Sequence, residues 1–173
     1  MTRVAVIGNA GGGKSTMCAR LSAITGLPYY PIDKIQWQPG WVPTPRDDFN
    51  RTHDALIARE RWIIDGWGSP EAIAARFEAA DTIIFVDHPL AWHYWWAIKR
   101  QIKSAFGPVA EAPDGCPLLP VTWRMLKLIW QIHYTRRPDM LRQVEAFRDR
   151  KRVVHIRSPR QLRRFVREVA ASA

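Results

Sequence analysis

Residues 8–16, with the sequence GNAGGGKST, constrain the fold of this chain more than any other segment. They match the pattern G-x-x-x-x-G-K-[ST], in which a glycine-rich turn joins a buried strand to a helix. Glycine is needed there because backbone N–H groups must approach phosphate oxygens closely, and side chains would stand in the way. The apolar run Val4–Ile7 precedes the turn, and Met17, Leu21 and Ile24 follow it at helical spacing. The segment therefore predicts a phosphate-binding loop between a strand and a helix.

The residues of this loop also predict how a nucleoside triphosphate is held. Backbone N–H groups and the positive end of the following helix favour phosphate. The ammonium of Lys14 is expected to reach the β- and γ-phosphates, and the hydroxyl of Ser15 is expected to bind Mg²⁺. The predicted nucleotide-binding residues of the loop are Gly8, Asn9, Ala10, Gly11, Gly12, Gly13, Lys14, Ser15 and Thr16.

Two apolar runs end in an aspartate, where a second metal ligand is expected. The runs are Trp62–Asp65, followed by Gly66, and Ile83–Asp87. Open α/β sheets bind their ligands at the carboxyl ends of the strands, so either carboxylate can face Mg²⁺. We favour Asp65, because Gly66 lets the backbone turn sharply beside a ligand. The alternative for each aspartate is a residue that only caps its strand.

Apolar runs and helical periods alternate along most of the chain. Uncharged runs such as Thr82–Val86 and Val153–Ile156 are typical of buried parallel strands. With the helical periods between them, they predict an α/β fold in which helices cover both faces of a parallel sheet. A mass of 20.0 kDa fits one domain, residues 1–173. The proline-rich stretch within residues 101–137 breaks the alternation, and we interpret it as a lid insertion over the site; the alternative is a passive surface excursion.

The net charge of the chain is +10, and most of the excess lies in residues 136–173. Four arginines of this part recur at helical spacing, namely Arg160, Arg163, Arg164 and Arg167. A basic excess favours phosphate-bearing ligands, nucleic acid or an anionic membrane surface, and charge alone does not choose among them. The same pattern is typical of a solvated terminal helix.

Composition excludes several classes of protein. No apolar run is long enough to span a membrane, and the apolar stretch near the first residue is too short for a secretory signal. Two cysteines cannot form a disulfide framework, and no Cys and His spacing suggests a zinc site. We therefore expect a cytoplasmic protein.

Further residues follow the loop in a characteristic order. They are Asp33, the pair Trp37 and Trp41, the run Trp62–Gly66, Arg76, Lys99-Arg100, Gly115–Pro117 and Arg137-Pro138. With these residues the chain resembles the adenylate-kinase-like P-loop proteins known as DNA topology modulation proteins. The resemblance implies a three-layer P-loop NTPase of the nucleoside- or nucleotide-kinase type. It also implies five parallel strands in the order 2-3-1-4-5, with ATP and Mg²⁺ on the loop.

The resemblance further implies roles for single residues. It places the acceptor against Asp33, Trp37, Trp41, Asp65, Gly66 and Arg76, and the adenine ring near Ser158. Arg100 falls where similar kinases begin a lid with transition-state arginines, and Arg136 and Arg137 at the far end of the insertion are alternatives. Asp33 or Asp65 can orient or deprotonate an acceptor hydroxyl. The predicted catalytic residues are Lys14, Asp65, Arg100 and Arg137.

Two groups of tryptophans allow more than one interpretation. Trp37 and Trp41 either stack on an acceptor or serve local packing. Trp92, Trp95 and Trp96 share one predicted helix, which is either the packed base of the insertion or a surface that touches a base, a partner or a membrane.

Three functions compete for this sequence. The first is an ATP- and Mg²⁺-dependent phosphotransferase that moves the γ-phosphate to a small nucleoside, nucleotide or similar metabolite. The second is a nucleotide-switch ATPase that controls a partner. The third is a DNA-associated regulatory protein without small-molecule kinase activity. The phosphate-binding loop favours the first and the second, whereas the basic C-terminal part is the main argument for the third.

Overall fold

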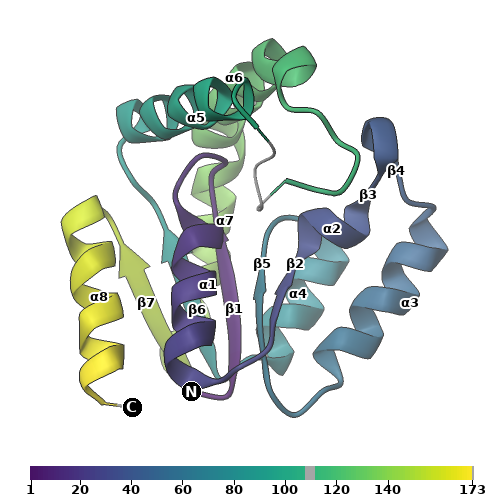
Figure 1. Ribbon diagram of the computed structural model, residues 1–173. Helices are drawn as coiled ribbons and strands as arrows, with labels where there is room; N and C mark the ends of the chain where they lie inside the picture. Colours follow the sequence, from purple (N-terminus) through teal and green to yellow (C-terminus); the bar gives the residue numbers. More distant parts are fainter. Residues whose placement is uncertain (108–111, 173) are drawn as a thin grey trace.

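The central sheet of the computed structural model has five parallel strands (Figure 1). The structure describes residues 1–107 and 112–172, so residues 108–111 of the predicted insertion lie outside it. The strands are β1 (Arg3–Gly8), β2 (Tyr29–Pro31), β5 (Trp62–Asp65), β6 (Thr82–Val86) and β7 (Arg152–Ile156). They lie in the order β2-β5-β1-β6-β7, which is 2-3-1-4-5 when they are counted along the chain. The predicted fold class and strand order are confirmed.

Helices cover both faces of this sheet, because successive strand residues point to opposite sides. Val4 and Val6 of β1 pack in the cluster under α1 and α8. Ala5 and Ile7 pack in the cluster on the other face, under α3, α4 and α7. These helices are α1 (Lys14–Thr25), α3 (Arg46–Ile57), α4 (Pro70–Ala79), α7 (Arg137–Glu145) and α8 (Pro159–Ala171). The arrangement has the three layers that the alternation of strands and helices predicts.

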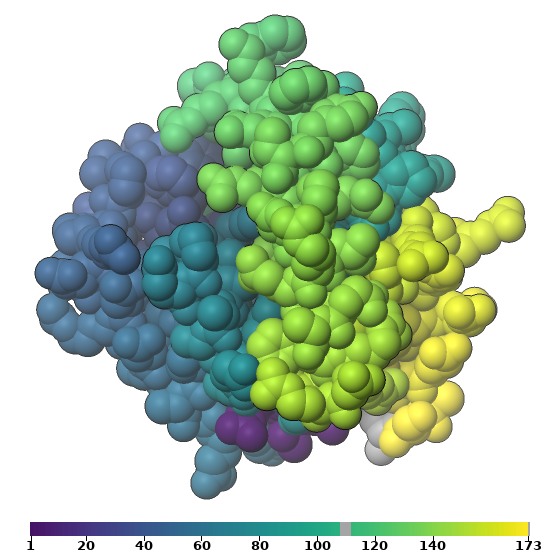
Figure 2. Space-filling view, turned by 180° about the vertical axis from the view of Figure 1, so that it is seen from behind, coloured from purple at the N-terminus to yellow at the C-terminus, as the bar shows by residue number. Residues whose placement is uncertain are grey.

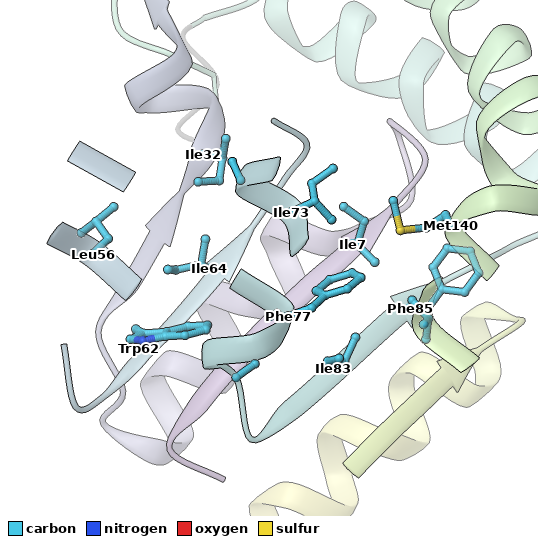
Figure 3. Close-up of a cluster of buried hydrophobic side chains, with 14 of the residues drawn as sticks. Ile7, Ile32, Leu56, Trp62, Ile64, Ile73, Phe77, Ile83, Phe85 and Met140 are labelled. Atoms are coloured by element: carbon cyan, nitrogen blue, oxygen red, sulfur yellow. The ribbon is translucent and has the colours of Figure 1, made fainter. Parts of the chain in front are cut away.

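The cluster under α4 and α7 is drawn in Figure 3. Phe77 of α4 and Met140 of α7 belong to it together with the strand residues Ile7, Ile83 and Phe85. All five side chains are buried, and each contributes about 1.5–3 kcal/mol through its loss of contact with water. Packing on both faces thus holds the carboxyl ends of β1 and β6 firmly in place.

Two helices begin with the residues expected of a helix start. Ser69 and Ser158 each lie at an N-cap, and their hydroxyls accept hydrogen bonds from the backbone N–H groups of Ala72 and Gln161. A proline follows each serine at the first helical position, where its missing N–H group has no cost.

A cover of two helices lies above the carboxyl ends of the strands (Figure 1). α5 (Leu90–Ser104) and α6 (Thr122–Gln131) pack against each other, and the short turn η2 (Leu119–Val121) leads into α6. A π-helical turn, η3 (Ile132–Arg136), then continues α6 into α7. Figure 2 shows this green segment running down the back of the molecule between α4 and α8. The sequence predicted a helix at α5, but neither the π-helical turn nor α7.

A small hairpin after β2 was also not predicted. It follows the short helix α2 (Ile32–Gln36) and consists of β3 (Trp37–Gln38), the turn η1 (Pro39–Trp41) and β4 (Val42–Pro43). Strands of two residues are too short to show a hydrophobic period.

Candidate functional site

Gly8 and Gly11 of the loop lie too close to their neighbours for any side chain. A Cβ atom at Gly8 would lie 2.2 Å from the carbonyl oxygen of Val86, and one at Gly11 would lie 2.5 Å from that of His93. Gly13, which caps α1, has a φ of 73° that glycine adopts readily. The loop is thus enclosed by β6 on one side and by α5 on another, and the backbone N–H groups at the start of α1 have no competing side chain.

Lys14 lies at the end of the loop with its side chain buried. Its Nζ donates a hydrogen bond to the carbonyl oxygen of Asn9 at 2.7 Å, and the residue is 9% exposed. Burial lowers the pKa of Lys14, and the nearby carboxylate of Asp65 acts in the opposite direction. A buried ammonium beside a neutral carbonyl group gains most from an anion. The position therefore suits a phosphate oxygen.

The hydroxyl of Ser15 and the carboxylate of Asp65 lie together beside the loop. Ser15 Oγ donates to Asp65 Oδ2 at 3.0 Å, and the hydroxyl of Tyr29 donates to Asp65 Oδ1 at 2.9 Å. Burial raises the pKa of Asp65, although the Lys14 ammonium and the two hydroxyls oppose the shift. Burial also raises the pKa of Tyr29, so this hydroxyl keeps its proton. Asp65 is thus a buried carboxylate that is bound by neutral groups only.

This pair of oxygen ligands fits Mg²⁺. Magnesium prefers oxygen and is usually held by one or two carboxylates together with water and the phosphates of a substrate. In the part of the chain that the structure describes, no group of three or more His, Cys, Asp or Glu side chains could hold a metal ion by itself. Ser15 and Asp65 would therefore hold Mg²⁺ jointly with the phosphates on the loop.

Asp87, the alternative metal ligand, lies beside a guanidinium and an imidazole. Arg137 donates to both of its carboxylate oxygens, from Nε at 2.6 Å and from Nη2 at 2.9 Å, and His155 Nε2 lies 2.9 Å from Oδ2. Burial disfavours the charged form of Asp87, but the hydrogen bonds from Arg137 and His155 outweigh it and lower the pKa. This carboxylate is already neutralised, so Asp65 is the better metal ligand.

The same ion pair bears on the catalytic role predicted for Arg137, which stays a prediction. Arg137 was expected to close over the phosphates as a catalytic cation, yet its guanidinium is bound to Asp87 and does not line the main cavity. Its neighbour Arg136 does line the cavity. The π-helical turn that ends at Arg136 separates the two side chains in a way that the sequence alone does not reveal.

A cavity of about 1590 Å³ opens in front of the loop. It is lined by the loop from Ala10 to Thr16, by Asp65 and Gly66, and by the inner sides of α5 and α6. The further cations along its wall are Arg20, Lys99, Arg100, Lys103, Arg124, Lys127 and Arg136. The carboxylates are Asp33, Asp65 and Asp139. The wall therefore attracts anions well beyond the phosphate-binding loop itself.

Trp37 and Trp41, both predicted acceptor residues, line the same cavity from the hairpin. Their rings meet edge to face with centroids 5.7 Å apart, and the guanidinium of Arg124 lies 5.9 Å from the Trp37 ring. Trp41 Nε1 also donates to the carbonyl oxygen of Pro117 at 2.8 Å. These contacts fasten the hairpin to the segment before α6, so that the two parts together close one side of the cavity.

Of the predicted acceptor residues Gly66 and Arg76, only Gly66 lines the cavity. Gly66 lines the cavity with a φ of 120°, and a Cβ atom there would lie 2.9 Å from that of Ile32. Arg76 is 1% exposed, does not line the cavity, and donates from Nη2 to the carbonyl oxygen of Gly66 at 2.8 Å. Burial lowers the pKa of Arg76 to about 10. Arg76 thus supports the backbone next to Asp65, and its predicted contact with the acceptor stays a prediction.

Ser158, the residue predicted near the adenine ring, caps α8 and does not line the cavity. Leu162, one turn further along α8, does line it, as does Trp96 of α5. The Trp96 ring lies 3.4 Å from the position that a Cβ atom at Gly13 would take. An apolar wall beside the phosphate-binding loop is thus present, and its members come from two helices that are distant in sequence.

Several residues that hold the loop in place were not singled out in the sequence. Trp67 Nε1 donates to the carbonyl oxygen of Gly8 at 2.9 Å. The side chain of Asn9 donates to the carbonyl oxygen of Ile129 in α6 at 2.8 Å. In the sequence, Trp67 could have been noticed only by its position directly after Gly66, at the end of the strand that carries Asp65.

Comparisons with known proteins identify the fold. No model of a protein family matches the chain, and no curated protein matches it. A shikimate kinase from Acinetobacter baumannii in complex with shikimate has a TM-score of 0.60 at 12% identity, covering 98% of this chain and 90% of the other. A gluconokinase from Sinorhizobium meliloti 1021 has a TM-score of 0.54 at 17% identity, and the match covers 98% of this chain and 90% of the gluconokinase. A sugar kinase from Janibacter sp. HTCC2649 has a TM-score of 0.52 at 17% identity, and the match covers 99% of this chain and 92% of the sugar kinase.

The chain therefore has the fold of these P-loop kinases. At such low identity the likeness establishes the fold and leaves the reaction to be argued from the site. The narrower resemblance to DNA topology modulation proteins has no matching family model and stays a prediction. Among the described residues, no helix has both the length and the apolar character needed to cross a membrane.

Proposed function

We propose that this protein is an ATP- and Mg²⁺-dependent phosphotransferase whose acceptor is a small anionic molecule, such as a nucleotide or a similar metabolite. One observation carries the proposal. Lys14 and the pair formed by Ser15 and Asp65 face a single cavity whose opposite wall is lined by cations of α5 and α6. A second substrate with its own negative charge would account for those cations. We also take residues 1–173 to act as one domain, with residues 101–137 inserted over the site.

The residues supply what phosphoryl transfer requires, which is mostly positioning and neutralisation of charge. Lys14 and the backbone N–H groups of the loop hold the phosphates, and Mg²⁺ held by Ser15 and Asp65 supplies further positive charge. Asp33, on the acceptor side of the cavity, accepts the proton as the acceptor oxygen bonds to the γ-phosphorus and the bond to the leaving ADP breaks. Arg100 and Arg136 are the cations placed to steady the transferring group.

Fold and charge both support this function. The three solved structures named above are kinases of small molecules, and one of them holds shikimate, whose carboxylate is anionic. Trp37 and Trp41 offer flat apolar surfaces at the same end of the cavity as Asp33. An acceptor with a ring and an anionic group would use both the aromatic and the cationic parts of the wall.

The proposal is tested by measuring ADP release against a panel of nucleosides, nucleoside monophosphates, sugar acids and sugar phosphates. We expect one anionic compound to raise ADP formation by about 100-fold or more over the rate without acceptor. Lys14→Ala is the control, because it removes the phosphate-binding ammonium from the loop. Activation by neutral acceptors alone would contradict the anionic assignment.

Two other outcomes favour the competing functions. Slow hydrolysis of ATP that none of the acceptor compounds accelerates would indicate a nucleotide switch. Hydrolysis that rises only when DNA is added, with binding that weakens steeply as salt increases, would indicate a nucleic-acid-associated protein. Either result would replace the phosphotransferase as the function of the site.

A further inference from the structure

The exposed large apolar side chains of this protein are concentrated in one region. Among the described residues, all but Met1 and Val42 lie between Trp92 and Tyr134, in α5, in α6 and next to these helices. Contiguous apolar surface of this kind marks sites of interaction on otherwise polar proteins. The outer face of α5 contributes Trp95, Ile98 and Ile102, which are 59%, 45% and 58% exposed.

The spacing of these residues defines a continuous stripe along α5. Trp95, Ile98 and Ile102 recur at i, i+3 and i+7, so they share one side of the helix. Phe106, 87% exposed, follows just after the helix ends. The opposite side of α5 is formed by buried residues such as Ala97, which packs against the phosphate-binding loop. None of the stripe residues lines the cavity, so the function proposed above does not explain their exposure.

The charges of α5 point to the occupant of this stripe. The helix has no acidic residue, and the exposed Lys99 and Lys103 lie between the apolar stripe and the side of the helix that lines the cavity. The segment from Gly115 to Pro138, which includes the neighbouring α6, has no acidic residue either. A helix with Trp and Ile on one side, Lys at its border and no carboxylate is suited to the interface of an anionic bilayer.

We propose that the outer face of α5 docks on an anionic lipid bilayer, with Trp95, Ile98 and Ile102 inserted among the headgroups and the exposed Lys99 and Lys103, at the border between the stripe and the cavity, close to lipid phosphates. A second copy of this chain is disfavoured, because pairing α5 with itself would bring lysines together without acidic partners. Nucleic acid is disfavoured, because Ile98 and Ile102 are aliphatic and only Trp95 of the three residues offers a ring on which a base can stack. The bilayer accounts for the apolar and the cationic groups together.

The test uses the whole protein in a sedimentation assay with vesicles. We expect the protein to sediment with vesicles of phosphatidylcholine mixed with phosphatidylglycerol, and to stay in solution with phosphatidylcholine alone. The double variant Ile98→Ser/Ile102→Ser is expected to weaken binding by about tenfold or more, since two exposed apolar side chains are lost. ADP release is expected to be unchanged, because neither residue lines the cavity.

The matched control is Val42→Ser, which changes an aliphatic side chain that is 52% exposed on the distant hairpin. This variant is expected to bind the mixed vesicles as the unmodified protein does. A thermal melt of each variant confirms that it is folded. Equal binding to both kinds of vesicle, no binding to either, or equal loss in Val42→Ser and in the α5 variant would overturn the proposal.

Two further measurements test the alternative occupants of the stripe, a second copy of the chain and nucleic acid. Light scattering that finds a stable dimer, which the α5 double variant converts to a monomer, would assign the stripe to a second copy. Binding of single-stranded DNA that the same variant abolishes would assign it to nucleic acid. Both results would overturn docking on lipid, while neither would affect the phosphotransferase, which is tested by ADP release without vesicles.

Discussion

The carboxyl ends of β5 and β6 present the same residue in two different environments. Both strands flank β1, and each leads to a buried aspartate: Asp65 is the last residue of β5, and Asp87 directly follows β6. Asp65 is bound by the neutral hydroxyls of Ser15 and Tyr29, whereas Asp87 is bound by Arg137 and by the imidazole of His155. The comparison teaches that the partners of a strand-end carboxylate, rather than its place in the sheet, decide whether its charge remains available to a ligand.

The largest expected effect follows from changing Asp65. Asp65→Asn keeps the size of the side chain but removes the negative charge that faces Ser15. We expect turnover to fall by about 100-fold or more and the Mg²⁺ requirement to rise, because a ligand of the metal is lost. Measuring ADP release across a Mg²⁺ series tests this. A variant that keeps the Mg²⁺ dependence of the unmodified protein would remove Asp65 from the metal site.

The matching change at Asp87 is expected to affect stability instead. Asp87→Asn leaves the guanidinium of Arg137 without its anionic partner, which we expect to lower the free energy of unfolding by about 1–3 kcal/mol, since Arg137 is partly exposed to water. Denaturant unfolding measures this loss. The double variant Asp87→Asn/Arg137→Met is expected to recover part of it. A change in Mg²⁺ dependence without a change in stability would reverse the roles of the two strand ends.

The pH dependence of stability is expected to have opposite signs at the two ends. The pKa of Asp87 is lowered from 3.8, so its contribution is present above that value and is lost as the pH falls through the lower folded pKa. The pKa of Asp65 is raised from 3.8, so the metal-free protein loses stability as the pH rises from 3.8 through the folded pKa. Unfolding curves across this range test both signs, with Asp65→Asn and Asp87→Asn as references.

Comparison with the two variants shows which result would contradict this prediction. Stability relative to Asp87→Asn should rise with pH, and stability relative to Asp65→Asn should fall. Two slopes of the same sign would mean that the partners of the carboxylates do not control their charge as described.

The smallest effects are expected from the remaining partners of the two carboxylates, Tyr29 and His155. Tyr29→Phe removes one hydrogen bond to Asp65, and we expect a change of only a few-fold in the Mg²⁺ concentration at half-maximal turnover. His155→Gln removes one of the donors to Asp87 while Arg137 remains, and we expect a loss of about 1 kcal/mol in the free energy of unfolding. Both variants are tested by Mg²⁺ titration and by denaturant unfolding. We expect Tyr29→Phe to change mainly the Mg²⁺ dependence and His155→Gln to change mainly the free energy of unfolding.

The parts of the site that could be predicted from sequence are those set by local pattern. The run Val4–Ile7, the glycines after it and Lys14 lie within one stretch of chain, and their chemistry dictates a strand, a turn and a helix. The strand order was predicted through the resemblance, and Asp65 through its place at a strand end. Periods of apolar residues and turn residues sufficed for these elements because each carries its own local pattern in the sequence.

The remaining parts depend on contacts between segments far apart in sequence. The bond from Asn9 to Ile129 spans 120 positions and the one from Trp41 to Pro117 spans 76. Nothing local distinguishes a buried Arg76 from one that lines a cavity, or directs Arg137 toward Asp87. The α5 tryptophans show the same limit, since Trp96 faces the cavity and Trp95 faces solvent one position away.

The cover is joined to the sheet at both of its ends, through His93 of α5, whose Nδ1 lies 3.0 Å from the carbonyl oxygen of Ala10, and through Arg137 at Asp87. A third bond, from Asn9 of the loop to Ile129 of α6, lies between these two along the chain. Any entry of a substrate that leaves all three bonds intact must therefore move the hairpin rather than the helices of the cover, and the bond between Trp41 and Pro117 would be among the contacts that break.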